Sequence, residues 1–222
     1  GFLALARRAG LRLEPLARVE ADALESLCRA TTVAALYVVP TNDNPTTVTI
    51  AADERAALAA VARRHGVRII EDDAYGQLSE TPIAPLSSFA PELGWYVASV
   101  SKTISPALRV AHVRAPSVED ALALAAEVHD ANVMAPPLEA ALVTRWREDG
   151  SYDRLIGETR AEAAARQAIA AEILPGGSYA AHPCGYHLWV PLASGADPVR
   201  LAGELRRAGM TAIPADGFAA GE

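Results

Sequence analysis

Short apolar runs alternate with alanine-rich amphipathic stretches through the first half of the chain. The runs Ala35–Val39, Val67–Glu71 and Trp95–Ala98 are short, apolar and rich in strand formers, which is typical of buried β-strands. The amphipathic stretches predict helices over Gly1–Ala9, Ala21–Arg29 and Asp53–His65, and Gly66 is expected to end the last of these. An extended segment is expected over Leu11–Leu16. This alternation predicts an α/β fold with a mostly parallel sheet.

The pattern changes after Pro116. Long alanine-rich helical stretches are expected over Val118–Ala131 and Leu138–Leu174, with Pro136 and Pro137 interrupting them. The remaining expected elements are a strand over Tyr186–Leu192, a helix over Asp197–Ala208 and a short strand over Met210–Ile213. We therefore expect residues 1–116 to form part of a large domain, and residues 117–222 to form interdomain helices and a smaller α+β domain.

Polar clusters follow three of the predicted strands. They are Asn44-Pro45-Thr46, the segment from Asp72 to Tyr75, and the segment from Ser99 to Lys102. In open α/β sheets, ligands bind at the carboxyl ends of the strands. The three clusters are therefore predicted to share one edge of the sheet and to form one site.

Composition and charge narrow the function classes. With 222 residues, of which 51% are hydrophobic and 21% charged, the chain can bury a substantial core. Its net charge of -7 argues against a nucleic-acid-binding face within these residues, so any DNA-binding part would lie outside them. Cys28, Cys184 and the five histidines show no metal-ligand spacing, so no metal site is predicted and a reducing, cytoplasmic setting is expected. No apolar run is long enough to span a bilayer, and without an initiator methionine or signal layout the chain is interpreted as an internal segment.

Lys102 lies among groups that could bind a phosphorylated aldehyde. A lysine after a strand is usually solvated, but here the hydroxyl residues Ser99, Ser101 and Thr103 surround it and Arg109 follows seven positions later. Hydroxyls and a guanidinium together can hold a phosphate. A lysine amine can bind an aldehyde as a Schiff base. The combination suggests pyridoxal phosphate.

Asp72, Tyr75 and Asn44 could complete such a site. Asp72 and Asp73 are equally compatible with a turn or a helix cap. A carboxylate at the sheet edge could instead pair with a pyridinium nitrogen and keep it protonated. Tyr75 and Asn44 could donate hydrogen bonds to the phenolic oxygen of the same ring, although Asn-Pro is also an ordinary turn signal.

The motifs taken together are more specific than any one of them. Asn-Pro-Thr, then Asp-x-Ala-Tyr, then Ser-x-Ser-Lys with an arginine seven residues on, resembles the fold-type I pyridoxal-phosphate enzymes of the class I/II aminotransferase family. The resemblance runs along the whole chain. It implies that Lys102 is the Schiff-base lysine and also moves the proton at the substrate Cα. It further implies that Asp72 pairs with the pyridine nitrogen, while Tyr75 and Asn44 contact the phenolic oxygen.

The resemblance also assigns the phosphate ligands. Ser99 and Arg109 are similar to the family's phosphate-binding residues, with Ser101 a weaker candidate. Two positions depart from the family pattern, because Thr47 and Ala111 stand where glycine is usual. Either change could crowd a backbone that glycine would leave free to adopt unusual dihedral angles.

Other parts of the family's site have no counterpart within these residues. The glycine-rich phosphate loop, the aromatic ring that stacks on the cofactor and a tyrosine from the partner subunit precede the region where the chain begins. The carboxylate-binding arginine normally follows the region of Phe218. The chain is therefore expected to carry half of a site, and the family implies a homodimer with the site at the subunit interface.

Two functions follow from the resemblance, and both keep the cofactor. The first is an aminotransferase that passes an amino group between an amino acid and a 2-oxo acid. The second is the effector-sensing domain of a MocR-type transcription regulator, since Tyr186–Trp189 and Thr144–Gly150 look similar to that branch. A basic winged-helix module upstream would favour the regulator. A degenerate domain that binds nothing would require the site residues to coincide by chance.

Overall fold

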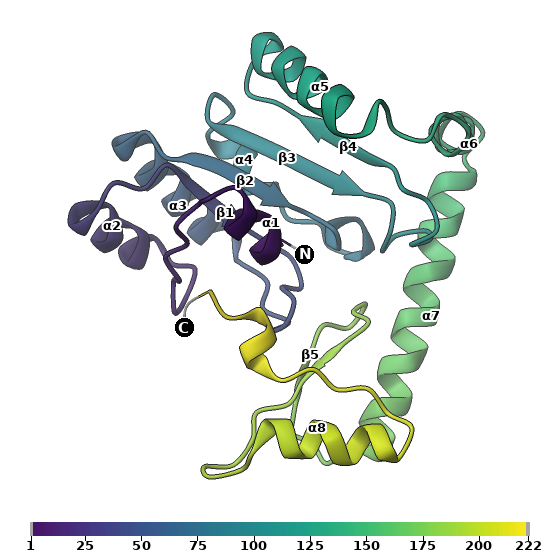
Figure 1. Ribbon diagram of the computed structural model, residues 1–222. Helices are drawn as coiled ribbons and strands as arrows, with labels where there is room; N and C mark the ends of the chain where they lie inside the picture. Colours follow the sequence, from purple (N-terminus) through teal and green to yellow (C-terminus); the bar gives the residue numbers. More distant parts are fainter. Residues whose placement is uncertain (1, 221–222) are drawn as a thin grey trace.

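The computed structural model describes residues 2–220 (Figure 1). In chain order its elements are α1 (Phe2–Arg8), α2 (Ala21–Ala30), β1 (Ala35–Val38), α3 (Ala52–His65), β2 (Arg68–Asp72), the 3-10 helix η1 (Gly76–Leu78), α4 (Leu86–Phe89), β3 (Gly94–Ser99), β4 (Ala111–Arg114), α5 (Val118–Asn132), α6 (Pro137–Glu148), α7 (Ser151–Ile173), β5 (Ala180–Ala181), β6 (Leu188–Trp189), α8 (Pro198–Arg207) and the 3-10 helix η2 (Ala215–Phe218).

The main sheet has the order β1-β2-β3-β4. Strands β1, β2 and β3 run parallel, with Ile70 paired to both Tyr37 and Trp95, whereas β4 is antiparallel to β3. This confirms the predicted α/β fold with a mostly parallel sheet. The hydrophobic pattern did not predict β4, because His112 and Arg114 interrupt its apolar residues and the whole strand is exposed.

One face of the sheet packs against helices α2, α3 and α4. Leu36, Val38 and Ile69 point to one face and are buried in a core that includes residues of α2, α3 and α4. Glu71 lies on the same face and is fully buried, and its two carboxylate oxygens accept hydrogen bonds from the backbone N–H groups of Leu86 and Ser87 at 2.9 and 2.8 Å. Those donors belong to the first turn of α4, so the buried carboxylate satisfies the otherwise unpaired amides of a helix start.

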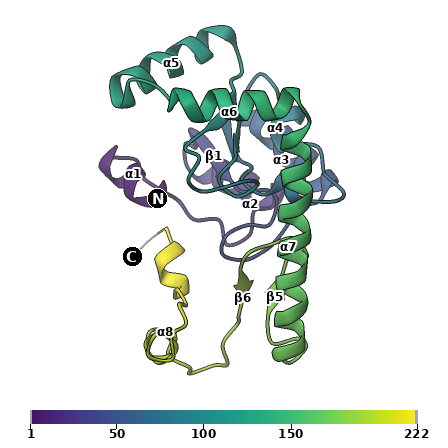
Figure 2. The same cartoon turned by 90° about the vertical axis from the view of Figure 1, so that its right-hand side faces the viewer.

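A second layer of the molecule lies below the sheet in Figure 1. It contains the two-stranded antiparallel sheet β5–β6 and helix α8, and α7 connects it to the level of the main sheet (Figures 1 and 2). Helix α7 is also fastened to η1, because Arg160 donates from Nε to the Leu78 carbonyl at 2.8 Å and the Tyr152 hydroxyl donates to Gln77 Oε1 at 2.8 Å. The long helix thereby fixes the segment that follows Tyr75.

Helix α7 is the longest element described, with 23 residues. Charged side chains are distributed along it, from Asp153 near its start to Glu172 near its end. No helix within residues 2–220 is both long enough and apolar enough to cross a membrane.

Three expectations for the second half of the chain were wrong. The helical stretch Leu138–Leu174 is two helices, because Gly150 adopts a left-handed conformation with φ 77° between α6 and α7. The expected strand over Tyr186–Leu192 shrinks to Leu188–Trp189, the part that pairs with β5. Met210–Ile213 forms no strand; both named residues are exposed and no neighbouring strand pairs with them. A short apolar run becomes a strand only where a partner can satisfy its backbone groups.

Candidate functional site

The sheet brings four of the predicted site residues to one edge. Asp72 ends β2 and pairs with Val97, so Asp72 and Ser99 project to the same side of the sheet. The antiparallel ladder of β3 and β4 continues past Ser99, since the Val100 amide donates to the Val110 carbonyl at 3.3 Å. Ser101 and Arg109 each lie one residue beyond this last backbone bond, at the same edge of the sheet. The three polar clusters follow parallel strands and therefore lie at one edge of the sheet, while their assignment to one site stays a prediction.

The serine and arginine side chains form a set of donors suited to an anion. Ser99 Oγ and Ser101 Oγ are 2.8 Å apart, and the Ser101 amide donates to Ser99 Oγ at 3.2 Å. The Arg109 side chain is exposed, and neither Arg109 nor Lys102 forms an ion pair with any residue between 2 and 220. Two hydroxyls and a guanidinium without an internal counter-ion fit a phosphate group.

Lys102 is the only lysine in the chain. Lysine and arginine together account for 20 residues, so every other basic position except the histidines is arginine. The exposed Lys102 follows β3 in a tight turn, where the amides of Ile104 and Ser105 both donate to the Val100 carbonyl. The composition is thus a further signal for this position, because a chain that otherwise uses arginine has a primary amine only here. Thr103, by contrast, is buried beside it.

Asp72 receives a hydrogen bond that the sequence did not reveal. The Tyr37 hydroxyl on β1 donates to Asp72 Oδ2 at 2.7 Å, and the ring of Tyr37 stacks on Phe2 with 3.9 Å between ring centroids. Burial raises the pKa of Tyr37, and the hydrogen bond to Asp72 raises it further, so the phenol keeps its proton. Asp72 Oδ1 has no hydrogen-bond partner among the described residues, which fits a carboxylate that receives a protonated ring nitrogen.

The neighbouring carboxylate has a structural role. Asp73 Oδ1 accepts a hydrogen bond from the Gly76 amide at 2.9 Å, and Asp73 Oδ2 accepts one from the Tyr96 hydroxyl at 2.7 Å. A Cβ at Gly76 would clash with the Asp73 carboxylate, so glycine favours this turn. The turn interpretation therefore applies to Asp73, and Asp72 is left available at the sheet edge.

The two residues expected near the phenolic oxygen differ in exposure. Tyr75 is 5% exposed and packs in a cluster with Val100 and Leu108, whereas Asn44 is exposed in the loop after β1. Burial raises the pKa of Tyr75, followed by the charges of Tyr186 and Asp72, so its hydroxyl stays protonated at neutral pH. A protonated phenol can donate a hydrogen bond to a ligand oxygen. The roles of Tyr75 and Asn44 remain predictions.

Of the two departures from glycine, one strains the backbone. Thr47 has φ 63° and is 8% exposed, and its amide donates to the Asp43 carbonyl at 2.7 Å. A β-branched residue is seldom found in this left-handed region. Ala111 lies in β4 and has no positive φ, so the expected crowding occurs at Thr47 alone.

Replacement of Thr47 by glycine is expected to stabilise the protein. Glycine adopts φ near 60° without a steric penalty, which offsets its entropic cost, so the free energy of unfolding should rise by about 1 kcal/mol. Urea unfolding of the full-length protein measures the change. Thr47→Ala is the matched control, since alanine keeps most of the strain and should gain little. Equal gains for both variants would show that the strain is not the cause.

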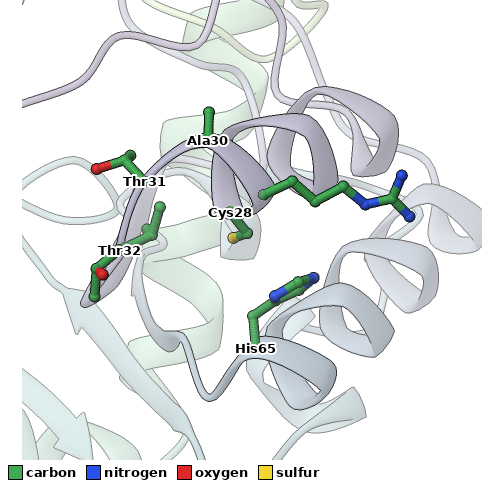
Figure 3. Close-up of a pocket in the computed structure, with 7 residues that line it drawn as sticks. Cys28, Ala30, Thr31, Thr32 and His65 are labelled. Carbon is green, nitrogen blue, oxygen red and sulfur yellow. The ribbon is translucent and has the colours of Figure 1, made fainter.

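A separate surface hollow lies at the far end of α2. It has a volume of about 410 Å³, and Figure 3 shows Cys28, Thr31, Thr32 and His65 around it. Burial raises the pKa of the Cys28 thiol, and the charge of Glu25 raises it further, so the thiol stays protonated. His65 Nε2 lies 3.2 Å from the Glu25 carboxylate. The hollow therefore lacks an activated nucleophile and contains none of the predicted site residues.

Two aminotransferases of known structure share this fold. An archaeal alanine:glyoxylate aminotransferase matches with a TM-score of 0.78 at 23% identity over 91% of this chain and 53% of that one. The α-aminoadipate aminotransferase LysN from Thermus thermophilus, solved with N-(5'-phosphopyridoxyl)-L-leucine, matches with a TM-score of 0.77 at 25% identity over 90% of this chain and 54% of its own. The fold is thus that of the fold-type I aminotransferases.

Comparison of the sequence with known families shows the family to which the chain belongs. Residues 4–174 match the family described as aminotransferase class I and II, and the chain belongs to that family. An uncharacterized HTH-type transcriptional regulator of Bacillus subtilis, YdeF, is 28% identical over 90% of this chain and 43% of its own length. The vitamin B6 salvage pathway transcriptional repressor PtsJ of Salmonella typhimurium is 32% identical over 84% of this chain and 44% of its own length. A 2-aminoadipate transaminase of Thermus thermophilus is 33% identical over 60% of this chain and 35% of its own length. The chain spans less than half the length of these relatives.

Proposed function

We propose that this chain provides the lysine-bearing half of the site in a pyridoxal-phosphate-dependent aminotransferase. The observation that carries the proposal is the place of the chain's single lysine. Lys102 lies in the loop after β3, at the sheet edge that also holds Asp72, Ser99 and Arg109. Membership of the aminotransferase family supports it. The substrates would be an amino acid and a 2-oxo acid.

Each side chain would have a distinct task. Pyridoxal phosphate, when bound, supplies an aldehyde and an electron-withdrawing ring. Lys102 Nζ would hold the cofactor through its aldehyde, and the same amine would move the proton at the substrate Cα. Asp72 would keep the ring nitrogen protonated through Oδ1, since Oδ2 already accepts a hydrogen bond from Tyr37.

The remaining residues would orient the ligand. Ser99, Ser101 and Arg109 bind the phosphate through two hydroxyls and a guanidinium. Tyr75, with Asn44, donates to the ring oxygen. We further propose a cytoplasmic homodimer in which the second subunit completes the site, as the family resemblance implies.

The second candidate is the effector-sensing domain of a MocR-type transcription regulator. Two transcriptional regulators, from Bacillus subtilis and Salmonella typhimurium, align over 90% and 84% of this chain, more than the 60% aligned with the 2-aminoadipate transaminase. In this case the same residues would bind cofactor and amino acid, and the output would be a conformational response rather than turnover.

A half-reaction experiment separates the two functions. The full-length protein is loaded with pyridoxal phosphate and mixed with each of the twenty amino acids, while the visible absorption band and the released 2-oxo acid are measured. An aminotransferase is expected to lose the band and release one equivalent of 2-oxo acid with at least one amino acid. A shifted band with no 2-oxo acid from any amino acid would contradict the enzyme and favour the regulator.

A further inference from the structure

Two adjacent residues of the layer below the main sheet contact the loops after β1, β2 and β3, which we call the three site loops. The Tyr186 hydroxyl donates to the Lys102 carbonyl in the loop after β3, with 2.7 Å between the oxygens. His187 Nε2 lies 3.1 Å from the Asp43 carbonyl in the loop after β1. The ring centroids of both residues are 6.3 and 6.0 Å from that of Tyr75, in the loop after β2, each tilted by 51°.

The chemistry of the His187 contact fixes which nitrogen carries the proton. A backbone carbonyl can only accept, so Nε2 must be the donor to Asp43. His187 Nδ1 is buried and has no partner among the described residues. The contact with Asp43 is therefore the one hydrogen bond among the described residues that sets the orientation of the His187 ring.

The segment that carries this pair is anchored on its other side. Gln167 of α7 donates from Nε2 to the Gly185 carbonyl at 2.8 Å. Gly185 is buried against the loop after β1, since a Cβ there would lie 2.9 Å from Asn42 Nδ2. Helix α7 therefore holds one side of the segment, while Tyr186 and His187 contact the site loops on the other side.

We infer that Tyr186 and His187 are positioning residues that hold the three site loops in one arrangement. The loops follow three separate strands, and Tyr186 and His187 touch each of them at a main-chain or ring contact. Removal of a contact should let its loop open independently of the others. The further consequence, a weaker hold on the cofactor at Lys102, rests on the proposed function.

Hydrogen exchange on the cofactor-free full-length protein tests the inference without relying on activity. Tyr186→Phe deletes the hydroxyl and keeps the ring, and amides in residues 100–105 should exchange about two- to tenfold faster, the range expected for one lost hydrogen bond. His187→Phe should have the corresponding effect on residues 41–47. Tyr179→Phe is the matched control, because this tyrosine of the same layer contacts no site loop through a described hydrogen bond.

The pattern of the changes decides the outcome. Faster exchange in residues 100–105 for Tyr186→Phe and in residues 41–47 for His187→Phe, with Tyr179→Phe unchanged, supports the inference. Rates in both segments that equal those of the control would overturn it. The visible band of each loaded protein is recorded in parallel: if the parent shows no band, the proposed function fails while the exchange result still decides the positioning role.

Discussion

Replacement of Lys102 by alanine in the full-length protein is expected to abolish the visible absorption band formed with pyridoxal phosphate. The chain has no other lysine, and the site edge offers no other primary amine. If the protein is an aminotransferase, loss of the group that moves the Cα proton should also lower turnover by about 10²- to 10⁴-fold. Absorption spectra and 2-oxo acid release measure the two effects.

Two further variants test whether a positive charge at position 102, or a lysine elsewhere in the chain, is enough to form the band. Lys102→Arg keeps a positive charge in the loop but cannot bind the aldehyde covalently, so it should also lack the band. A double variant, Lys102→Ala with Arg206→Lys, restores one lysine at an exposed position of α8 and should remain without the band. A band in either variant would show that the covalent attachment does not depend on Lys102.

Replacement of Arg55 by methionine is expected to lower the free energy of unfolding by about 3–5 kcal/mol, because it removes a buried charge that satisfies several acceptors. The side chain is 1% exposed. Its guanidinium donates to the carbonyls of Ile50, Ala84 and Pro40 and to Thr41 Oγ1, at 2.9 to 3.1 Å. Burial lowers the pKa of Arg55, but the nearby charges of Glu71 and Asp73 act in the opposite direction, and the group remains charged.

The same contacts hold the base of the loop that carries Asn44. Pro40 and Ile50 flank that loop, and the Ile50 amide also donates to the Pro40 carbonyl at 2.9 Å. Urea unfolding measures the loss. Arg63→Met on the same helix is the control, since its contacts with Glu92 and with the Phe89 carbonyl are exposed and should contribute little to stability. Equal destabilisation by the two substitutions would show that the buried acceptors do not depend on Arg55.

The fold of the first half was predictable because its signals are local. Apolar runs of four or five residues gave β1, β2 and β3, and Gly66 gave the end of α3 with its left-handed conformation. The position of Asp72 at the end of a strand followed from the same pattern. The family resemblance then supplied roles that periodicity alone does not contain.

What could not be predicted depends on contacts between distant segments. The hydrogen bond from Tyr37 to Asp72 requires the β1–β2 register, and the turn role of Asp73 requires the position of Tyr96 on β3. The lower layer was harder for the same reason, since Leu188 and Trp189 form a strand only where Ala180 and Ala181 pair with them. Tyr186 and His187 reach the site across more than 80 residues of sequence, and their spacing gives no sign of it.

Lys102 is the residue to which we propose that pyridoxal phosphate attaches. Borohydride reduction of the loaded full-length protein, followed by peptide mass spectrometry, tests it most directly. We expect the pyridoxyl phosphate group on the peptide that contains Lys102, and no labelling of that peptide in Lys102→Ala. Labelling at a different residue in the parent protein, with Lys102 unmodified, would contradict the account.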